Sequence, residues 1–385
     1  MNQNSKFQKT PSTAATEAGS PALSRRDFHR LLAGAGLAVG GLAAGGTLAL
    51  PGRARAADIN LTVFEWSGYD DPSLFPEFVK KYGGQPNFAI FAEEEEAYQK
   101  LRAGFKVDLA HPCTLSVGRW RDAGLLKPID TSRIARWKDI PTDMLAAKGI
   151  MADGKTWFMP FDWGNSTIIY REDELPKAEQ SYKLLLDPKL KGKVSMFDSV
   201  DEAFVFASGV LGYKSHMDLT DDQIQKCAEV LRQLHKNVRF YWSDPTALQQ
   251  AMAAGEVTAA WAWTDSYLAL KGEKVDVKFM FPKEGLSTWM CGMVMLKDAP
   301  GNLDQAYDYL NAMLDPQVGK VLIDDWGYGH SNRNSYKLAT SELAKQLGLT
   351  SDLDKFLKGT RYQGEIPPEK REKMIDIFEQ VKLGG

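Results

Sequence analysis

The alternation of strand-like and helix-like segments along most of the chain limits its fold more than any other feature. Residues 59–66 are rich in β-branched and aromatic side chains, which is typical of a strand, and Asp71-Pro72 then begins a helix that Gly83-Gly84 ends. The pattern continues with a strand over 87–92, a helix over 93–102, a strand over 107–109 and a helix that Thr114 caps and that runs through Trp120. Such alternation predicts a parallel sheet flanked by helices.

A second alternating set follows residues 157–164 and predicts a second α/β lobe. Strands are expected over 167–170, 194–197 and 238–241, within 256–267 and over 289–296, and helices over 202–212, from 220, and over 245–254, 304–314, 316–325 and 368–381. No low-complexity linker or internal repeat separates the two sets. The sequence therefore predicts two α/β lobes that are bridged by strands, with a cleft between them.

The residues that follow the strands are the first candidates for a binding site, because ligands of open α/β sheets bind beyond the carboxyl ends of the strands. These residues are Trp66, Ser67 and Tyr69, then Cys113 and Thr114, then Ser199 and Glu202, then Ser243, and finally Trp263 and Asp265. The topology predicts that they converge on one cleft.

The stretch 256–267 predicts one wall of that cleft. If the extended conformation persists to its end, strand alternation places Trp261, Trp263 and Asp265 on one side. Aromatic faces beside a carboxylate suit a bound cation. We expect Trp261 in the core, because large aromatic side chains are mostly buried, and Trp263 in the site, because it lies at the end of the strand.

Other side chains also have the chemistry to hold an ammonium group. Trp66, Tyr69 and Trp289 offer aromatic faces, and Glu202 offers a carboxylate. Tyr69 is equally suited to anchoring its loop, and Glu202 to favouring the N-terminus of its helix. Asp162, at a crossover between the lobes, is a further candidate acid.

Arg239 is the candidate for an anionic ligand group. Strand alternation places Arg239, Tyr241 and Ser243 on one face, so that Arg239 could clamp a carboxylate or a phosphate. We favour the other interpretation, a solvated arginine at the end of a strand.

The beginning of the chain is interpreted as a removable export signal. Its parts are Arg25-Arg26 with Phe28, a Gly/Ala/Leu run over 32–50, and Ala54-Arg55-Ala56, which together form a twin-arginine signal over 1–57 with cleavage near Ala56/Ala57. A membrane anchor is the alternative, since the apolar run approaches the ~20 residues that span a bilayer, but its many glycines weaken partitioning into lipid. We therefore expect passage through the twin-arginine translocase into the periplasm.

Removal of this signal makes the protein more acidic. The whole chain has 47 Lys and Arg against 50 Asp and Glu, and the signal carries seven and two of these, so that 40 against 48 remain and the net charge becomes −8. An acidic exported protein binds nucleic acid poorly and suits cationic or zwitterionic small molecules.

Catalytic and metal-binding patterns are missing from the sequence. It has no G-x-S-x-G, H-E-x-x-H, C-x-x-C or Walker sequence, so we predict no catalytic residues, no cofactor and no metal. His111-Pro112-Cys113 is the one pair that could begin a soft-metal site, but no second pair follows at a suitable spacing. Cys227 lies in a helix with a capping box at Thr220 and Gln223 and is expected to be a buried core thiol. Three cysteines allow at most one disulfide within the chain.

Several short motifs resemble the periplasmic substrate-binding proteins of ABC transporters, in particular the spermidine/putrescine-binding group. The matching pieces are Phe64-Glu65-Trp66-Ser67-Gly68-Tyr69, Val107 to Thr114, Met159-Pro160-Phe161-Asp162-Trp163-Gly164, Gly255-Glu256-Val257 leading to Trp263, Pro282-Lys283-Glu284-Gly285 with Trp289-Met290, and Gly327-Tyr328. Their order and spacing extend the resemblance from about Asp58 to Leu383.

The resemblance implies a two-lobed periplasmic binding protein of type II, in which each lobe is a sheet flanked by helices and crossover strands join the lobes. It implies that residues 58–161 and 290–335 form lobe 1, and that 162–289 and 336–385 form lobe 2. It also implies closure on a ligand that is presented to a membrane permease. The implied site has an aromatic box of Trp66, Tyr69, Trp263, Trp289 and Tyr328, with Glu202 as an amine-binding carboxylate and Gln363 as a loosely matched cleft amide.

The chain also departs from this group. Cys291 and Ser199 stand where the group usually has Asp, and Cys113-Thr114-Leu115 replaces a Ser-Thr-Tyr motif, while Asp265 is an added acid. A lost hydrogen bond to a charged group costs ~1.5–3 kcal/mol, which favours a shorter ligand with one cationic end over a long polyamine. By the resemblance, Cys113 and Cys291 lie near the cleft, as a disulfide or as two free thiols.

The sequence as a whole predicts a monomeric receptor for a small amine or zwitterion that serves an ABC importer. Trp263→Ala and Asp265→Asn are each expected to weaken binding ~10-fold or more. One alternative on the same fold is a receptor for an anion or a metal complex, with Arg239, His111 and Tyr241 as contacts. The other is an enzyme exported by the twin-arginine route.

Overall fold

The computed structural model describes residues 58–147, 149–340, 342, 349 and 360–385. The predicted export signal over 1–57 lies outside the described residues. Among the residues that are described, no helix has the length and apolar character needed to cross a membrane.

Twelve strands of the described residues form one sheet. Its main path, in spatial order, is β2 (Asn87–Phe91), β1 (Thr62–Trp66), β3 (Leu109–Ala110), β12 (Ser287–Leu296), β7 (Met159–Arg171), β10 (Ala259–Trp263), β8 (Val194–Phe197) and β9 (Val238–Trp242). The short strands β4 (Leu126–Lys127) and β14 (Arg361–Tyr362) pair with β12, and β11 (Val277–Phe279) and β13 (Gly329–His330) pair with β7. β5 (Met151–Ala152) and β6 (Lys155–Thr156) form a separate pair.

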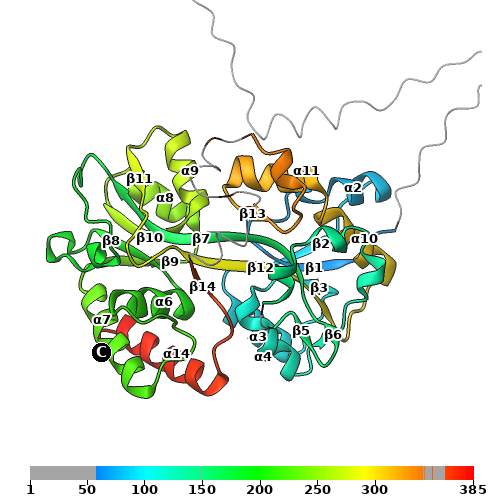
Figure 1. Cartoon of the computed structure of the whole chain (residues 1–385), viewed down its shortest axis with the longest axis horizontal. Helices are drawn as coiled ribbons and strands as arrows, with labels where there is room; N and C mark the ends of the chain where they lie inside the picture. The colour runs from blue at the N-terminus through cyan, green and yellow to red at the C-terminus, as the bar shows by residue number, and fades with distance from the viewer. Residues whose placement is uncertain (1–57, 148, 341, 343–348, 350–359) are drawn as a thin grey trace, which may run out of the picture. The chain divides into compact units, whose positions relative to one another are not determined.

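The two ends of the sheet are parallel, as the alternation predicts. β1 pairs in parallel with β2 and β3, and β8 pairs in parallel with β9 and β10. Between them the long strands β7 and β12 run antiparallel and pass from one lobe to the other (Figure 1). A bulge follows Cys291, where a Cβ on Gly292 would lie 2.1 Å from the carbonyl oxygen of Met159, so this approach requires glycine. The strands that join the lobes are therefore β7 and β12.

Helices cover this sheet. The α-helices are α2 (Pro76–Tyr82), α3 (Glu94–Arg102), α4 (Thr114–Asp122), α5 (Thr142–Leu145), α6 (Val200–Val210), α7 (Asp221–His235), α8 (Pro245–Ala253), α9 (Thr264–Gly272), α10 (Leu303–Met313), α11 (Pro316–Val321) and α14 (Pro368–Lys382). The shorter turns include η1 (Pro72–Leu74), η4 (Tyr182–Leu186), η7 (Ser335–Lys337) and a π-helical turn, η6 (Leu322–Trp326).

Three groups of buried apolar side chains form the cores among the described residues, one in lobe 1 and two in lobe 2. Lobe 1 has a core around Phe64, Trp120 and Tyr309, formed by β1–β3, α2–α4 and α10. Lobe 2 has its main core around Phe204 and Trp261, to which α6, α7 and α14 contribute. Trp261 is fully buried, which confirms its predicted place in the core. The predicted division of the chain between the lobes at residues 161, 289 and 335 stays a prediction. We assign Asp162 to lobe 1, because its neighbours Phe161 and Trp163 belong to the core around Phe64 and Trp120.

Most predicted elements are found within one or two residues of their expected ends, and the capping box of α7 is confirmed, as is the buried thiol of Cys227. One predicted cap is wrong. The Thr114 side chain does not cap α4, because the residue at the N-cap position is Cys113, and its backbone N–H donates instead to the Glu94 carboxylate of α3. A side chain from another helix therefore satisfies this helix end.

Candidate ligand-binding site

A cavity of about 130 Å³ lies where the carboxyl ends of β1, β3, β8, β9 and β10 meet. Its aromatic lining is Trp66, Tyr69, Phe91, Phe197, Trp263, Trp289, Trp326 and Tyr328. Its acidic lining is Glu93, Glu94, Asp201 and Glu202. Among the described residues, neither a lysine nor an arginine lines the cavity. Such a surface is electrostatically suited to a cationic group.

Most of the predicted site residues line this cavity. They are Trp66, Ser67, Tyr69, Cys113, Glu202, Ser243, Trp263, Trp289, Cys291 and Tyr328. Ser199 and Gln363, which the sequence analysis also noted, line it too. Thr114, Asp162, Arg239 and Asp265 lie outside its lining.

The aromatic side chains support one another in pairs. In lobe 2, the Trp263 ring centroid lies 4.7 Å from that of Phe197. On the other side of the cavity, the Trp289 and Tyr328 centroids are 4.9 Å apart in an edge-to-face arrangement. Such contacts fix the rings before a ligand arrives, which lowers the cost of ordering them on binding.

The structure confirms a solvated Arg239 and does not show an anion clamp. Arg239 is exposed and forms an ion pair with Glu256, with 2.8 Å between Nη2 and Oε2. The Tyr241 hydroxyl lies 3.1 Å from Nδ1 of His235 instead of facing the cavity, and His111 is buried elsewhere. The three residues that would contact an anion or a metal complex therefore do not converge.

Asp265 also departs from the prediction, because the extended conformation does not persist. β10 ends at Trp263 and α9 begins at Thr264, so that Asp265 lies in the first turn of a helix. Its carboxylate accepts a hydrogen bond from the hydroxyl of Tyr328, which does line the cavity. Burial raises the pKa of Asp265 to about 6. Asp265 thus contacts the cavity residue Tyr328 without lining the cavity itself.

Thr114 does not line the cavity and instead contacts β14 and the residue that follows it. Its hydroxyl lies 2.6 Å from the hydroxyl of Tyr362 and donates to the carbonyl oxygen of Gln363 over 3.3 Å. Thr114 is fully buried at the beginning of α4, whereas Gln363 follows β14.

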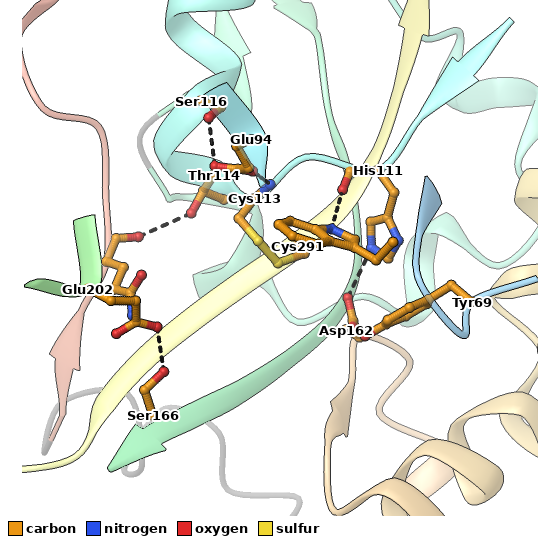
Figure 2. The surroundings of a disulfide bond; sticks show 12 residues. Tyr69, Glu94, His111, Cys113, Thr114, Ser116, Asp162, Ser166, Glu202 and Cys291 are labelled. Carbon is orange, nitrogen blue, oxygen red and sulfur yellow. Dashed lines mark hydrogen bonds and ion pairs between the residues drawn. A yellow bond between two sulfur atoms is a disulfide. The ribbon is translucent and has the colours of Figure 1, made fainter. Parts of the chain in front are cut away.

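Asp162 belongs to a buried cluster behind the aromatic residues of lobe 1, in which Tyr69, His111 and Asp162 point toward one another (Figure 2). The Tyr69 hydroxyl donates to Asp162, and Asp162 Oδ1 lies 3.1 Å from His111 Nε2. The other ring nitrogen of His111, Nδ1, is hydrogen-bonded to Glu65. One histidine therefore links two buried carboxylates.

The electrostatics of this cluster favour a charged histidine. Burial opposes the charge on His111, but the attraction of Glu65 and the hydrogen bond to Asp162 outweigh it and raise the His111 pKa to about 10. The carbonyl oxygen of His111 accepts the indole N–H of Trp66 over 2.8 Å. The cluster thus orients two cavity residues, Trp66 through the backbone and Tyr69 through Asp162.

The described residues that donate to the Glu202 carboxylate are all uncharged. Its carboxylate accepts hydrogen bonds from the hydroxyl of Ser166, from Nε1 of Trp261 over 2.8 Å, and from the amide of Gln363. Burial raises its pKa from the ordinary value despite these three donors. Figure 2 shows Glu202 and Ser166 on the side of the disulfide opposite to Asp162.

Three acids of the cavity, Glu93, Glu94 and Asp201, were not predicted as site residues. At Glu93 and Glu94 the sequence pattern predicted only a helix over 93–102. Glu93 caps α3, and Glu94 accepts the hydroxyl of Ser116 over 2.7 Å as well as the backbone N–H of Cys113. Burial raises the pKa of Glu93 to about 7 and that of Glu94 to about 8. The available signal for a site was that these residues stand at the beginning of a helix that follows a strand.

A disulfide joins Cys113 and Cys291 beside the cavity, which resolves the pairing that the sequence left open (Figure 2). The two residues also form an isolated antiparallel bridge. With Cys113 oxidised, His111-Pro112-Cys113 offers no metal pair, and the described residues contain no group of three or more side chains that could hold a metal ion. The disulfide is therefore a structural part of the cavity wall.

Comparison with known proteins gives consistent relatives. The family model for bacterial extracellular solute-binding proteins matches residues 77–348. The spermidine/putrescine-binding periplasmic protein of Escherichia coli (strain K12) is 29% identical over 332 residues, which cover 84% of this chain and 93% of that protein. The putrescine-binding periplasmic protein PotF of the same strain is 28% identical over 333 residues, which cover 82% and 89%.

Solved structures share the fold. The spermidine/putrescine ABC transporter substrate-binding protein PotD from Streptococcus pneumoniae is 23% identical, with a TM-score of 0.69 over 85% of this chain and 99% of that chain. The sheet with its two parallel ends, the helices on it and the cavity between two cores are those of a two-lobed periplasmic binding protein. Because the family model spans more than half of the sequence, the chain belongs to the bacterial extracellular solute-binding protein family.

Proposed function

We propose that this protein is the exported receptor of an ABC importer and that it binds a small amine or zwitterion in the cavity between its lobes. The observation that carries this proposal is the lining itself, with eight aromatic side chains, four carboxylates and no basic side chain among the described residues. The names of the relatives, which specify spermidine and putrescine, support a cationic ligand.

The aromatic box of Trp66, Tyr69, Trp263, Trp289 and Tyr328 would enclose the cationic group. A cation over such a ring gains ~0.5–2 kcal/mol, depending on how far the site is desolvated. The negative charge behind the rings adds to this attraction, because Glu65 and Asp162 face one histidine. A compact ammonium group therefore fits better than an anion.

One indole favours a ligand that also carries an oxygen. Nε1 of Trp289 is buried and has no hydrogen-bond partner within the described residues, and Trp289 lines the cavity. An unpaired buried donor costs ~1–3 kcal/mol, which a carboxylate, hydroxyl or carbonyl oxygen of a ligand would relieve. With the disulfide at Cys291, this supports a short amine with one cationic end over a long polyamine.

The biological setting follows from the same proposal. The signal over 1–57 would direct the protein through the twin-arginine translocase to the periplasm, with cleavage near Ala56/Ala57. There the protein, as a monomer, would close on its ligand and hand it to the permease of its importer.

A thermal-shift screen followed by calorimetry tests the proposal. The purified mature protein is screened against putrescine, spermidine, amino acids, betaines, 4-aminobutanoate and organic acids, because a ligand that binds only the folded state raises the apparent stability. We expect stabilisation by one or more amines or zwitterions and none by organic acids. Stabilisation by organic acids alone would contradict the proposal.

A further inference from the structure

Asp201 is a buried acid of the cavity whose carboxylate is only partly hydrogen-bonded by the described residues. The residue lies in the first turn of α6, is 3% exposed and lines the cavity. Its Oδ2 accepts a hydrogen bond from Nη2 of Arg371 over 2.8 Å. Its Oδ1 is buried and has no partner among the described residues. A buried carboxylate oxygen without a donor is costly, and a ligand donor would remove that cost.

The neighbouring carboxylate does not have this property. Glu202 receives three donors, from Ser166, Trp261 and Gln363. A carboxylate in that state has little capacity left for a ligand. Within the described part of α6, the oxygen that still lacks a donor is therefore that of Asp201.

Glu93 brings a second carboxylate from the other lobe. It precedes α3, lines the same cavity, and uses Oε2 to accept the backbone N–H groups of Glu95 and Glu96 over 2.6 and 3.4 Å. The repulsion from Asp201 is among the causes that raise the Glu93 pKa, after burial. The two acids are thus close enough to interact, with one in each lobe.

Arg371 positions the Asp201 carboxylate of this pair but does not take up its second oxygen. Its guanidinium bonds Glu95 of α3 through Nη1 and Asp201 of α6 through Nη2. The same arginine therefore holds the Asp201 carboxylate by one oxygen and leaves the other free. Arg371 is a positioning residue in this arrangement.

We infer that Asp201 and Glu93 form an ammonium subsite, in which the free Oδ1 of Asp201 accepts one N–H of the ligand and Glu93 faces the same group from the opposite lobe. This inference rests on the proposed amine-receptor function and specifies which carboxylate receives the amine. An ammonium group has three donors and replaces the repulsion between the two acids by attraction to both. Binding there would also favour the arrangement in which the lobes are together.

A metal ion suits this place less well. Calcium takes six to eight oxygen ligands and magnesium takes six. The described residues supply no cluster of three or more acids, histidines or cysteines for a metal. Two carboxylates, one of them shared with Arg371, match the smaller demand of an ammonium group.

Calorimetric titration of the intact mature protein with putrescine, 4-aminobutanoate and 4-hydroxybutanoate tests the subsite. The last two probes differ only in that an ammonium replaces a hydroxyl. For the amine that binds the wild type, we expect Asp201→Asn to raise the Kd at least 10-fold and Glu93→Gln to raise it about 5-fold. The preference for 4-aminobutanoate over 4-hydroxybutanoate should shrink in Asp201→Asn, which a general loss of folding would not produce.

Two further variants complete the test. Glu256→Gln, which removes an equally charged but exposed partner of Arg239, should leave every Kd unchanged. Glu93→Gln leaves the Asp201–Arg371 pair intact, so it tests the subsite even if Asp201→Asn folds poorly. If the wild type binds neither amine, the proposed receptor function fails together with the subsite. If the wild type binds an amine and both acid variants bind it equally well, the subsite alone is wrong.

Discussion

Behind the aromatic residues of lobe 1, the buried carboxylates Glu65 and Asp162 share a histidine, whereas in lobe 2 the buried carboxylate of Glu202 faces only uncharged donors. Both arrangements keep acids out of water next to the same cavity. In lobe 1 two buried acids share the ring of His111, whose pKa is raised to about 10, and in lobe 2 a hydroxyl, an indole and an amide donate to one buried acid.

The difference has consequences for how each half tolerates change. A buried ion pair becomes strongly unfavourable when one partner is removed, because the other charge stays buried without compensation. A carboxylate that is held by neutral dipoles loses only those hydrogen bonds when it is replaced by an amide of the same size. Substitutions at the buried acids and their partners should therefore destabilise the protein more in lobe 1 than in lobe 2.

The largest effect is expected from His111→Gln. It leaves Glu65 and Asp162 without a cation, so we expect the free energy of unfolding to fall by about 3–5 kcal/mol, as measured by urea denaturation at pH 7. Glu202→Gln is the matched change in lobe 2 and should cost about 1 kcal/mol or less. Equal losses for the two variants would show that the two lobes hold their acids in the same way.

Removal of the disulfide should have the next largest effect. The link between Cys113 and Cys291 joins residues that are 178 positions apart in the chain. Cys291 stands opposite Asp162 in the β7–β12 register, and Cys113 lies two residues along the chain from His111. We expect Cys113→Ala/Cys291→Ala to lower the free energy of unfolding by about 2–4 kcal/mol.

Added reductant distinguishes this effect from a packing defect. It should destabilise the wild type and leave the double variant unchanged, because the remaining Cys227 is a buried free thiol. If the reductant opens the bond and the stability of the wild type does not change, a stabilising role for the disulfide is refuted.

The aromatic residues can be compared between the lobes in the same way. Trp263→Ala removes a ring that rests on Phe197 in lobe 2, and we expect it to weaken amine binding about 10-fold or more. Trp66→Phe keeps a ring in lobe 1 but loses the bond from its indole to the carbonyl oxygen of His111, so about 3-fold is expected. Calorimetry with the best amine of the screen measures both, and a smaller loss for Trp263→Ala than for Trp66→Phe would reverse the ranking.

The pH response separates the histidine cluster from the acids of the cavity. The pKa values of Glu93 and Glu94, raised to about 7 and about 8 by burial, mean that the folded state binds more protons than the unfolded state between about pH 4.5 and 8. Stability without ligand should therefore fall as the pH rises through this window. The contribution of His111, whose pKa is raised to about 10, is complete below about pH 6.5 and is lost only as the pH rises toward 10.

Affinity should change in the opposite direction. Deprotonation of Glu93 and Glu94 makes the cavity more negative, so amine binding should strengthen about 3-fold to 5-fold from pH 6 to pH 8. Calorimetry across this range measures the change, and Glu93→Gln/Glu94→Gln should flatten it. A pH dependence that persists in this double variant would assign the titration to other groups.

The features that the sequence predicted correctly are those that depend on residues close together in the chain. Strand β8 and helix α8 are specified by side chains within a few residues, and both were placed correctly to within one residue. The convergence of Trp66, Ser243 and Trp263 followed from a general rule about strand ends. Such features need no knowledge of tertiary contacts.

The missed features depend on partners that are remote in sequence. Glu94 satisfies the beginning of α4 from 19 residues away, and His111 meets Glu65 and Asp162 across separations of 46 and 51 residues. Two interpretations of Arg239 stayed open because strand alternation gives the face of a side chain but not whether that face meets a cavity or the solvent. The sequence pattern alone does not determine which residues that are distant in the chain lie close together in the fold.

The smallest effect is expected at Asp265, to which the sequence analysis assigned a full ligand contact. Because α9 begins at Thr264, the carboxylate reaches the hydroxyl of Tyr328 and not the cavity lining, although its Oδ1 is buried without a partner within the described residues. At pH 7 a carboxyl group with a pKa of about 6 is mostly ionised, but this charge lies outside the cavity lining, so we expect Asp265→Asn to change the Kd for an amine by less than 3-fold. Tyr328→Phe, which removes the same hydrogen bond from the cavity side, should give a similar value. A loss of 10-fold or more in Asp265→Asn alone would place its carboxylate in direct contact with the ligand and would make lobe 2, like lobe 1, a half whose binding depends on a buried charge.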